Sequence, residues 1–491
     1  MQSKKKFIFD ASFVLLASLF TYALNFLRKP LLARYLGPEG LGLFAMVTVI
    51  AGFVELIASF GVPAAVIKYE SELKDKKDRS SLILSATVTM LLVGTFFIIV
   101  LIAISGYIED FFDMPSLGFL LNIYALAIPF SLMFTVILTF FNGIRSMKCY
   151  SYISTLKNVI NFVLTITLLI LGYGLGGVVT GSILAVIIGF VIAIFYMKGF
   201  VDFKINNFVE DVKKLASFGS KMLLSNSVGI INYKADIFLI GYFLTATDIG
   251  YYSVALSLSE FFWILPGAIQ QISYPATSDY WAKKDINRLN KMVDKSMKYS
   301  SIALLVAGLT IWIFAEPIIV FLFGTDFISA VLPLKILLIG TIIFGSINKP
   351  IAGSLAGAGF PNTEFVKVTI SAVVGVVFYI LLTPLYGITG AALATTLSLI
   401  FASFINIYFV VKKLNLKIDY EWYFKLSLTA ALFVYGNIKA NIVNQFFIDL
   451  VSIVLFTTIV MVFFLSKEDK RLFKSLIISI KMAASRKFCK I

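Results

Sequence analysis

Charged side chains interrupt long apolar runs of this 491-residue chain, and these charges are its main candidates for chemistry. A charge in hydrocarbon is costly, so each one marks a functional candidate unless it reaches the headgroups. The first run has polar residues at intervals of three, four and three, hence on one helical face: Ser18, Thr21, Asn25 and Arg28. Arg28 lies nine residues before Gly37, about 13 Å along a helix, which is deep for a snorkelling side chain. We predict that Asn25 and Arg28 line a cavity; for the adjoining Lys29, a cavity and the headgroups both stay open.

Lys234 and Asp236 lie in the middle of another apolar run, residues 220–244. Two residues of helix separate their side chains by about 200°, so they cannot easily pair with each other. Each therefore needs a partner on another helix, a ligand or a water-filled cavity. Two interpretations of Asp236 follow: it forms a static salt bridge, or it belongs to a gating pair that opens and closes with a cavity.

The other embedded charges are two glutamates and two inward-facing lysines. Glu55 and Glu260 are candidates for gating or for coupling to a cation; a neutral, hydrogen-bonded packing role for each is the alternative. Lys157 and Lys349 each lie beside asparagine and are expected to face the interior. Both are candidates for ligand binding.

The sum of these charges indicates the sign of a ligand. Six embedded residues are positive and three are negative, which leaves +3: Arg28, Lys29, Lys157, Lys234, Lys349 and Lys367 against Glu55, Asp236 and Glu260. Lys367 is near a helix end and is expected to snorkel. Because Arg and Lys bind phosphate well, a net positive cavity favours an anionic phosphate headgroup and disfavours a cationic drug.

Composition defines the elements that must position these residues. Hydrophobic residues make up 59% of the chain and charged residues only 14%, too little charge to coat soluble domains. The chain has no histidine, so His-based metal sites and triads are excluded, and we predict no metal site, cofactor or catalytic residue. The formal charge of +15 indicates a positive cytosolic face rather than a nucleic-acid partner. An all-α polytopic membrane protein is predicted.

Fourteen apolar runs are each long enough for a transmembrane helix. They lie near 7–35, 41–66, 82–106, 117–141, 150–171, 176–197, 220–244, 248–273, 299–323, 331–356, 364–384, 388–411, 422–440 and 446–466. Lys and Arg concentrate in alternate connections, and the intervening loops are short and acidic, which matches the positive-inside rule. The sequence therefore predicts fourteen helices with both termini in the cytosol.

Matches at nearly one offset indicate an internal repeat. Gly42 pairs with Gly250 at an offset of 208, and the YGLGG segment at 173–177 matches YGITG at 386–390 at 213. Six helices separate each matched pair, an even number, so the two halves are parallel repeats with a pathway between them. We predict an N-terminal lobe over 1–205, a C-terminal lobe over 206–411, and two extra helices with a basic cytosolic tail over 412–491.

The two segments LLARYLGPEGLGLFAMV (31–47) and DIFLIGYFLTATDIGYYSVA (236–255) resemble the polysaccharide-flippase signature. In layout the whole chain is similar to the O-antigen (Wzx-type) flippases of polysaccharide biosynthesis, within the multidrug/oligosaccharidyl-lipid/polysaccharide (MOP) exporter superfamily. The resemblance implies a V-shaped, MATE-like fold of two six-helix lobes that works by alternating access.

The resemblance also implies a function: translocation of a lipid-linked oligosaccharide, on polyprenyl phosphate or pyrophosphate, from the inner to the outer leaflet of the cell membrane. The expected partners are this anionic substrate and membrane lipids, with no nucleic acid. A coupling cation, proton or sodium, is an open alternative, as is a monomer set against a complex with glycan-assembly proteins. The competing function is a drug/cation antiporter of the same fold. An enzyme is not expected, because the outer loops are too short for a catalytic domain.

Overall fold

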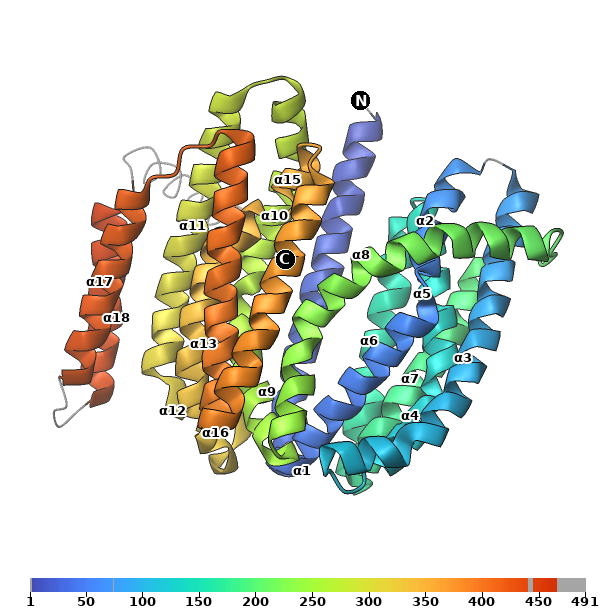
Figure 1. The fold of residues 1–491 in the computed structure, drawn as a ribbon, viewed down its shortest axis with the longest axis horizontal. Coiled ribbons are helices and arrows are strands. Elements are labelled where there is room, and N and C mark those ends of the chain that lie inside the picture. Colours follow the sequence, from blue (N-terminus) through green and yellow to red (C-terminus); the bar gives the residue numbers. More distant parts are fainter. Residues whose placement is uncertain (1, 74, 440–444, 466–491) are drawn as a thin grey trace, which may run out of the picture. The chain divides into compact units, whose positions relative to one another are not determined.

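The computed structural model describes the backbone of residues 2–73, 75–439 and 445–465 (Figure 1). It describes their side chains except at 2–16, 224–235, 272, 437–439 and 445–448. Within these residues all regular secondary structure is helical. The prediction of an all-α polytopic membrane protein is therefore confirmed at this level.

The helices of the first half, in chain order, are α1 (Gln2–Ser59), α2 (Val62–Glu72), α3 (Lys76–Phe112), α4 (Leu117–Ala125), α5 (Ala127–Gly143), α6 (Met147–Ile170), α7 (Gly174–Met197), α8 (Phe208–Phe243) and α9 (Ala246–Glu260). The second half contains η1 (Phe261–Trp263), α10 (Ile264–Ala282), α11 (Ile286–Ile313), α12 (Ala315–Phe323), η2 (Thr325–Ala330), α13 (Val331–Ile343), η3 (Phe344–Asn348), α14 (Lys349–Ile351), α15 (Ser354–Gly357), α16 (Pro361–Leu414), α17 (Tyr420–Lys439) and α18 (Gln445–Phe463).

Two of these helices each contain a reversal at a glycine. Gly37 in α1 has φ 67° and ψ −178°, and Gly387 in α16 has φ 59° and ψ −138°. Only glycine adopts such angles readily, because a Cβ would strain the backbone there. Figure 1 shows α1 turning back on itself at this point. Each long helix thus contains two of the predicted apolar runs.

Most described residues of the predicted runs are helical, and several runs contain a break between two helices, as at Leu126 between α4 and α5. Eight described helices are long and apolar enough to span a membrane, or nine if α4 and α5, bent by 47°, form one span. Two of these eight, Ala17–Ser59 and Pro361–Leu414, contain the glycine reversals. The figure of fourteen stays a prediction.

The chain divides into two compact units. The first consists of the chain up to Ile264 together with Glu316–Gly340 and Glu364–Ala402; the second consists of Leu265–Ala315, Thr341–Thr363 and the chain from Ser403 onward. In the first unit α1 packs against α9, α3 against α5, and α6 against α7. The lobe boundaries predicted at 205/206 and 411/412 stay a prediction.

The two repeat-matched glycines meet inside the first unit. A Cβ built on Gly42 would lie 1.7 Å from the carbonyl oxygen of Ala246, and one on Gly250 would lie 2.0 Å from that of Pro38. Pro38 and Ala246 are themselves 208 residues apart, the same offset as the glycines. The contact between α1 and α9 is therefore reciprocal, as expected where two equivalent segments meet on a two-fold axis.

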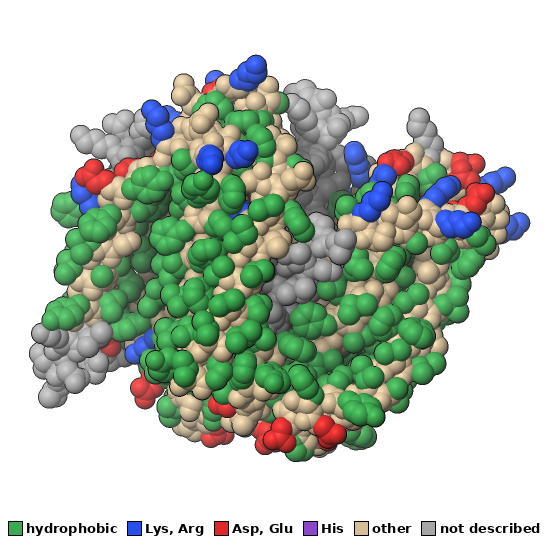
Figure 2. All heavy atoms as spheres, in the orientation of Figure 1, with side chains coloured by type: hydrophobic (Ala, Val, Ile, Leu, Met, Phe, Trp, Pro, Cys, Tyr) green, Lys and Arg blue, Asp and Glu red, His purple; other side chains and the backbone are tan. Residues whose placement is uncertain are grey.

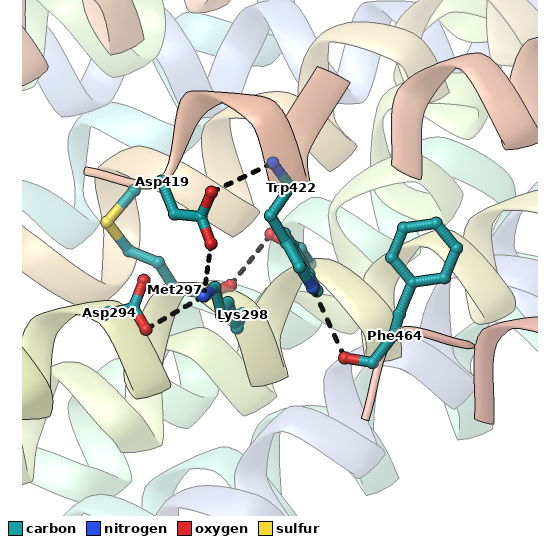
Figure 3. A network of polar contacts seen from close by, with 7 residues as sticks. Asp294, Met297, Lys298, Asp419, Trp422 and Phe464 are labelled. Atoms are coloured by element: carbon teal, nitrogen blue, oxygen red, sulfur yellow. Dashed lines mark hydrogen bonds and ion pairs between the residues drawn. The ribbon is translucent and has the colours of Figure 1, made fainter. Parts of the chain in front are cut away.

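In the second unit, α17 and α18 pack on α11. Leu426, Phe456 and Val460 share a buried apolar cluster with Ile302 and Leu309. Beside it lies a polar latch, which we define as Asp294, Lys298, Asp419 and Trp422 (Figure 3). Lys298 Nζ lies 3.1 Å from Asp294 Oδ2 and 3.0 Å from Asp419 Oδ2, and Trp422 N donates to Asp419 Oδ1.

The latch joins the helices at several points. The indole Nε1 of Trp422 donates to the carbonyl oxygen of Phe464 at 3.3 Å, which ties the start of α17 to the end of α18. The hydrogen bond from Lys298 holds the pKa of Asp419 below its usual range. The two C-terminal helices are therefore fastened to α11 by apolar packing and by this polar contact.

Charge is distributed unevenly along the helices. Within each unit in Figure 2, Lys and Arg gather mostly at one end of the helices, whereas the opposite end displays mostly Asp and Glu, with wide apolar surfaces between the two ends. Wide apolar surfaces are rarely exposed to water, and they are typical of protein surfaces that face lipid. Such an uneven distribution is typical of helices that follow the positive-inside rule.

Candidate functional site

The first candidate site is a group of charges in the first unit, here called the cationic cluster: Arg28, Glu55, Tyr124 and Lys157. The two arms of α1 supply Arg28 and Glu55, α4 supplies Tyr124 and α6 supplies Lys157. All three charged side chains are half-buried. The sequence predicted each charge separately, and the fold brings them together.

Electrostatic contacts connect the members of this cluster. The Glu55 carboxylate interacts with the Ser131 hydroxyl of α5 and with the charge of Lys157. Arg28 interacts with the phenol of Tyr124 and repels Lys157. Two cations against one carboxylate leave a net charge of +1, so the cluster suits an anionic ligand.

Aromatic rings and a glycine position the two cations. The guanidinium carbon of Arg28 lies 6.0 Å from the ring centroid of Phe44, and Lys157 Nζ lies 5.7 Å from that of Phe134. Such cation–π contacts stabilise a charge without neutralising it. A Cβ on Gly189 of α7 would lie 2.7 Å from Lys157 Cγ, so this glycine makes room for the lysine stem. The rings of Phe44 and Phe134 therefore lie beside the two cations of the cluster.

Asp236 lies in a different group of side chains in the same unit, here called the carboxylate–tyrosine cluster: Asp236, Tyr252, Tyr379 and Thr395. All four are buried, with exposed fractions of 9%, 0%, 7% and 8%. The Thr395 hydroxyl lies 2.6 Å from both phenol oxygens, and the Tyr252 hydroxyl donates to Asp236 Oδ2 at 3.4 Å. The backbone N–H of Ile237 donates to Asp236 Oδ1 at 2.7 Å. The carboxylate thus accepts hydrogen bonds from one backbone N–H and one phenol.

The reversal at Gly387 assembles this second cluster. Tyr379 lies eight residues before Gly387 and Thr395 eight residues after it, so the two arms of α16 bring them together. Sequence reasoning missed Tyr252, Tyr379 and Thr395, because neutral tyrosine and threonine are ordinary in apolar helices. Equal spacing from a turn glycine is the only sequence feature that could have indicated the Tyr379–Thr395 pair.

Lys29 contacts α9 rather than the cationic cluster. Its Nζ donates to the carbonyl oxygen of Ser253 at 2.5 Å and to the hydroxyl of Ser257. Nearby, the Arg34 guanidinium donates to the carbonyl oxygens of Phe321 and Leu322, the last turn of α12. Asn25 is exposed. The structure thus gives Lys29 a contact between α1 and α9.

The other predicted residues are distributed between the two units. Glu260 ends α9, and its charge reaches Tyr379 of the second cluster. Lys349 belongs to the second unit, where its Nζ lies 5.9 Å from the Phe344 ring centroid. Lys367 is buried and pairs with Glu364 at 2.7 Å, which removes it from the sum of free positive charges. The side chain of Lys234 lies outside the described residues.

The part of the chain that the structure describes contains no group of three Asp, Glu or Cys side chains able to hold a metal ion. Oxygen donors are nevertheless present in the carboxylate–tyrosine cluster, where Asp236 and Thr395 lie on neighbouring elements. Hydroxyl and carboxylate oxygens are the donors that hard cations prefer.

Comparison with known proteins gives a consistent result. The profile of a family described as "Polysaccharide biosynthesis protein" matches residues 31–332. A probable low-salt glycan biosynthesis flippase of Haloferax volcanii, Agl15, is 24% identical over 477 residues, which cover 94% of this chain and 97% of the relative.

Solved structures with the same fold belong to transporters. The lipid II flippase MurJ, in an inward closed conformation, superposes with a TM-score of 0.74 over 91% of this chain and 98% of its own, at 18% identity. An inward-facing multidrug resistance MATE family transporter of the MOP superfamily gives 0.65 over 80% and 94%, at 16% identity. At these identities the likeness establishes the fold.

Proposed function

Because the chain belongs to the polysaccharide biosynthesis protein family, we propose that it is a flippase that moves a lipid-linked oligosaccharide from the inner to the outer leaflet. The substrate is an oligosaccharide on polyprenyl phosphate or pyrophosphate, destined for a polysaccharide or surface glycan. The flippase names of its relatives support this function and do not suggest an enzyme. The observation that carries the proposal is the net positive, half-buried cluster of Arg28, Glu55 and Lys157.

The cationic cluster provides a physical basis for binding and release. A phosphate accepts charge-assisted hydrogen bonds from Arg and Lys, and it competes with Glu55 for Lys157. A ligand shifts a conformational equilibrium only through contacts that differ between states. Exchange of the Glu55–Lys157 interaction for a phosphate–Lys157 interaction is such a difference. Lys29, Lys234 and Lys349 remain proposed contributors to the substrate path.

The carboxylate–tyrosine cluster is the proposed coupling site. Asp236 is buried, it accepts hydrogen bonds from the Ile237 N–H and the Tyr252 hydroxyl, and Glu260 acts on the same cluster through Tyr379. A proton or a sodium ion bound at Asp236 would neutralise this carboxylate. Occupancy would then change the field at Tyr252 and Tyr379, on α9 and α16. These residues connect cation binding to the helices that are expected to move.

The proposed architecture has fourteen helices in two parallel lobes, with both termini in the cytosol of a cell-membrane protein. The reciprocal contact of Gly42 and Gly250 supports a two-fold relation between halves. The concentration of Lys and Arg at one end of the helices supports the orientation. We propose a monomer that alternates access between its lobes and that can associate with glycan-assembly proteins.

A drug/cation antiporter is the second candidate function. The likeness to a multidrug resistance transporter favours it at the level of the fold. The net positive charge of the cationic cluster opposes it, because a cationic drug would be repelled by Arg28 and Lys157.

A reconstitution experiment separates the two functions. Purified protein in liposomes that contain a fluorescent polyprenyl-pyrophosphate sugar should move the label between leaflets, and Arg28→Ala should abolish this movement. Arg288→Ala, at an exposed arginine of α11, is the matched control and should leave transport unchanged. Ethidium transport in the same liposomes, with no movement of the lipid-linked sugar, would favour the antiporter and overturn the flippase.

A further inference from the structure

The first part of α8 docks across the ends of other helices in the first unit. This docking segment, residues 208–220, packs on α2 and α3 before α8 turns along the bundle (Figure 1). A Cβ on Gly61 would lie 2.1 Å from the carbonyl oxygen of Gly219, and one on Gly219 would lie 2.4 Å from that of Phe60. The backbones are therefore in direct contact. The segment is also the connection between the two predicted halves of the chain.

Asp211 anchors the docking segment to α3. Its Oδ2 accepts hydrogen bonds from the hydroxyls of Ser81 at 2.6 Å and Ser85 at 3.1 Å. The Ser81 oxygen also accepts from the backbone N–H groups of Asn206 and Asn207. Asp211 is 7% exposed, so this buried carboxylate has the hydrogen bonds that it needs.

Glu70, on α2, lacks such bonds. It is fully buried, at 0% exposure, and neither of its carboxylate oxygens has a hydrogen-bond partner. The element packed against its stem is α5, where a Cβ on Gly143 would lie 2.8 Å from Glu70 Cβ. A buried carboxylate without donors costs several kcal/mol when ionised, and it takes up a proton instead.

The charged groups that act on Glu70 come from two other elements. Arg79, on α3, attracts its charge, and Asp211, on the docking segment, repels it; α5 presents the uncharged Gly143. Arg79 is itself committed through Nε to the carbonyl oxygen of Leu73. Glu70 lies beyond the apolar run that ends near residue 66. Burial raises the pKa of Glu70 to about 8, with Arg79 opposing and Asp211 adding to the shift.

We propose that Glu70 is a proton-binding site that controls the docking of residues 208–220 on α2 and α3. With the proton bound, Glu70 is neutral and Asp211 is the single buried charge at the contact. Without it, the buried Glu70 carboxylate is charged and is repelled by Asp211, and release of the docking segment restores water to both. The proposed ligand is a proton, because a buried carboxyl group whose oxygens have no hydrogen-bond donor takes up a proton.

The sign of the pH dependence follows from linkage. The pKa of Glu70 in the docked state is raised to about 8 from its usual value of 4.5. At pH values between 4.5 and 8, formation of the docked state therefore takes up a proton. The stability that this proton gives to the docked state is lost as the pH rises through 8. Over this interval the docking equilibrium constant falls about tenfold for each pH unit.

Hydrogen exchange on purified full-length protein in nanodiscs tests the proposal without substrate. Protection factors for residues 208–220, which remove the intrinsic pH dependence of exchange, should fall at least tenfold between pH 6.5 and 8.5. Glu70→Gln, which is permanently neutral, should keep high protection at both values. Glu72→Gln changes an exposed glutamate in the same helix and should behave as wild type. Because no transport is measured, failure of the flippase function leaves this result intact.

Several outcomes would overturn the proton site. Equal protection of residues 208–220 at both pH values in the wild type would do so, even if Glu70→Gln does not fold. If the protection of residues 208–220 changed with the concentration of sodium or magnesium at fixed pH, Glu70 would belong to a cation site instead. Arg79→Gln is a second variant, in which loss of the attracting charge should move the midpoint of the transition to higher pH. An unchanged or lowered midpoint would contradict the proposed electrostatics.

Discussion

The cationic cluster and the carboxylate–tyrosine cluster each contain a charged residue at the same position of the internal repeat, but the two charges have opposite sign. Arg28 lies nine residues before the turn glycine Gly37, and Asp236 nine residues before Thr245, the matching position in the repeat. Around Arg28 the charges are half-buried and mixed in sign, whereas Asp236 is buried and accepts a hydrogen bond from the Tyr252 hydroxyl. Half-buried charges can exchange partners with an incoming phosphate. A buried carboxylate with neutral donors can exchange only a proton or a small cation.

Removal of Arg28 is the largest expected effect. A charge-assisted hydrogen bond contributes about 1.5–3 kcal/mol, so Arg28→Ala should reduce substrate affinity on the order of 10- to 100-fold. In cells that lack the wild-type gene, export of the glycan should stop and lipid-linked intermediates should accumulate, with expression retained. Arg28→Lys should recover part of the transport. Normal export by Arg28→Ala at native expression would remove the cationic cluster from the mechanism.

Substitution at Asp236 distinguishes the two clusters by cation dependence. Asp236→Asn keeps the shape and one acceptor oxygen but removes the charge, so transport should lose its response to a proton or sodium gradient while substrate binding persists. Scintillation proximity binding of the lipid-linked sugar, beside transport in the same liposomes, measures both. If Asp236→Asn instead abolishes substrate binding and leaves the response to the gradient, the carboxylate–tyrosine cluster binds substrate and is not the coupling site.

A double charge reversal tests whether the clusters are independent. Arg28 and Asp236 lie nine residues before matching positions of the repeat, and the structure places them in two clusters. Arg28→Asp with Asp236→Arg should therefore fold no better than the sum of the single reversals, because sites without shared partners are additive. Thermal melting of the purified variants measures this. Recovery of stability by more than about 1 kcal/mol in the double variant would show direct coupling.

A side chain at Gly42 or Gly250 should destabilise the protein, because each glycine lies against the backbone of the other helix. Gly42→Ala places a Cβ on the backbone of α9 and should destabilise the protein by about 1–3 kcal/mol. Gly250→Ala should act equally, since the contact is symmetrical. Gly52, on the same helix, has open space around its Cβ position, so Gly52→Ala is the matched control. Unequal losses for Gly42 and Gly250 would weaken the two-fold relation.

Disruption of the polar latch should have the smallest effect on the stability of the protein. Its ion pair of Lys298 and Asp419 is partly exposed, so Lys298→Met should cost about 0–1 kcal/mol. The pKa of Asp419 is lowered in the folded protein, so the contribution is present above the ordinary pKa and is lost as pH falls through the lowered value. Melting curves at pH 7 and pH 3 measure both effects. A large loss at pH 7 would show that α17 and α18 depend on the latch more than on their apolar contacts with α11.

The sequence alone identified three features of the protein: the apolar runs, the basic loops between them and the charged residues within them. A helix in hydrocarbon must satisfy its own backbone and present about 20 apolar residues, whatever its neighbours are. Charges such as Arg28, Glu55 and Lys157 stand out in such runs for the same reason.

The partners of these charges were decided only by the tertiary structure. Tyr252, Tyr379 and Thr395 cost little in a membrane helix, so nothing in the sequence distinguished them from packing residues. Lys29 and Lys367 have long, flexible stems, and whether such an ammonium reaches a headgroup, a serine or a glutamate depends on the neighbouring helix. Glu70 looked like one of several glutamates in a basic loop region. It became a buried carboxylate without donors only when α2, α3, α5 and α8 closed around it, because burial is a property of the packing between elements.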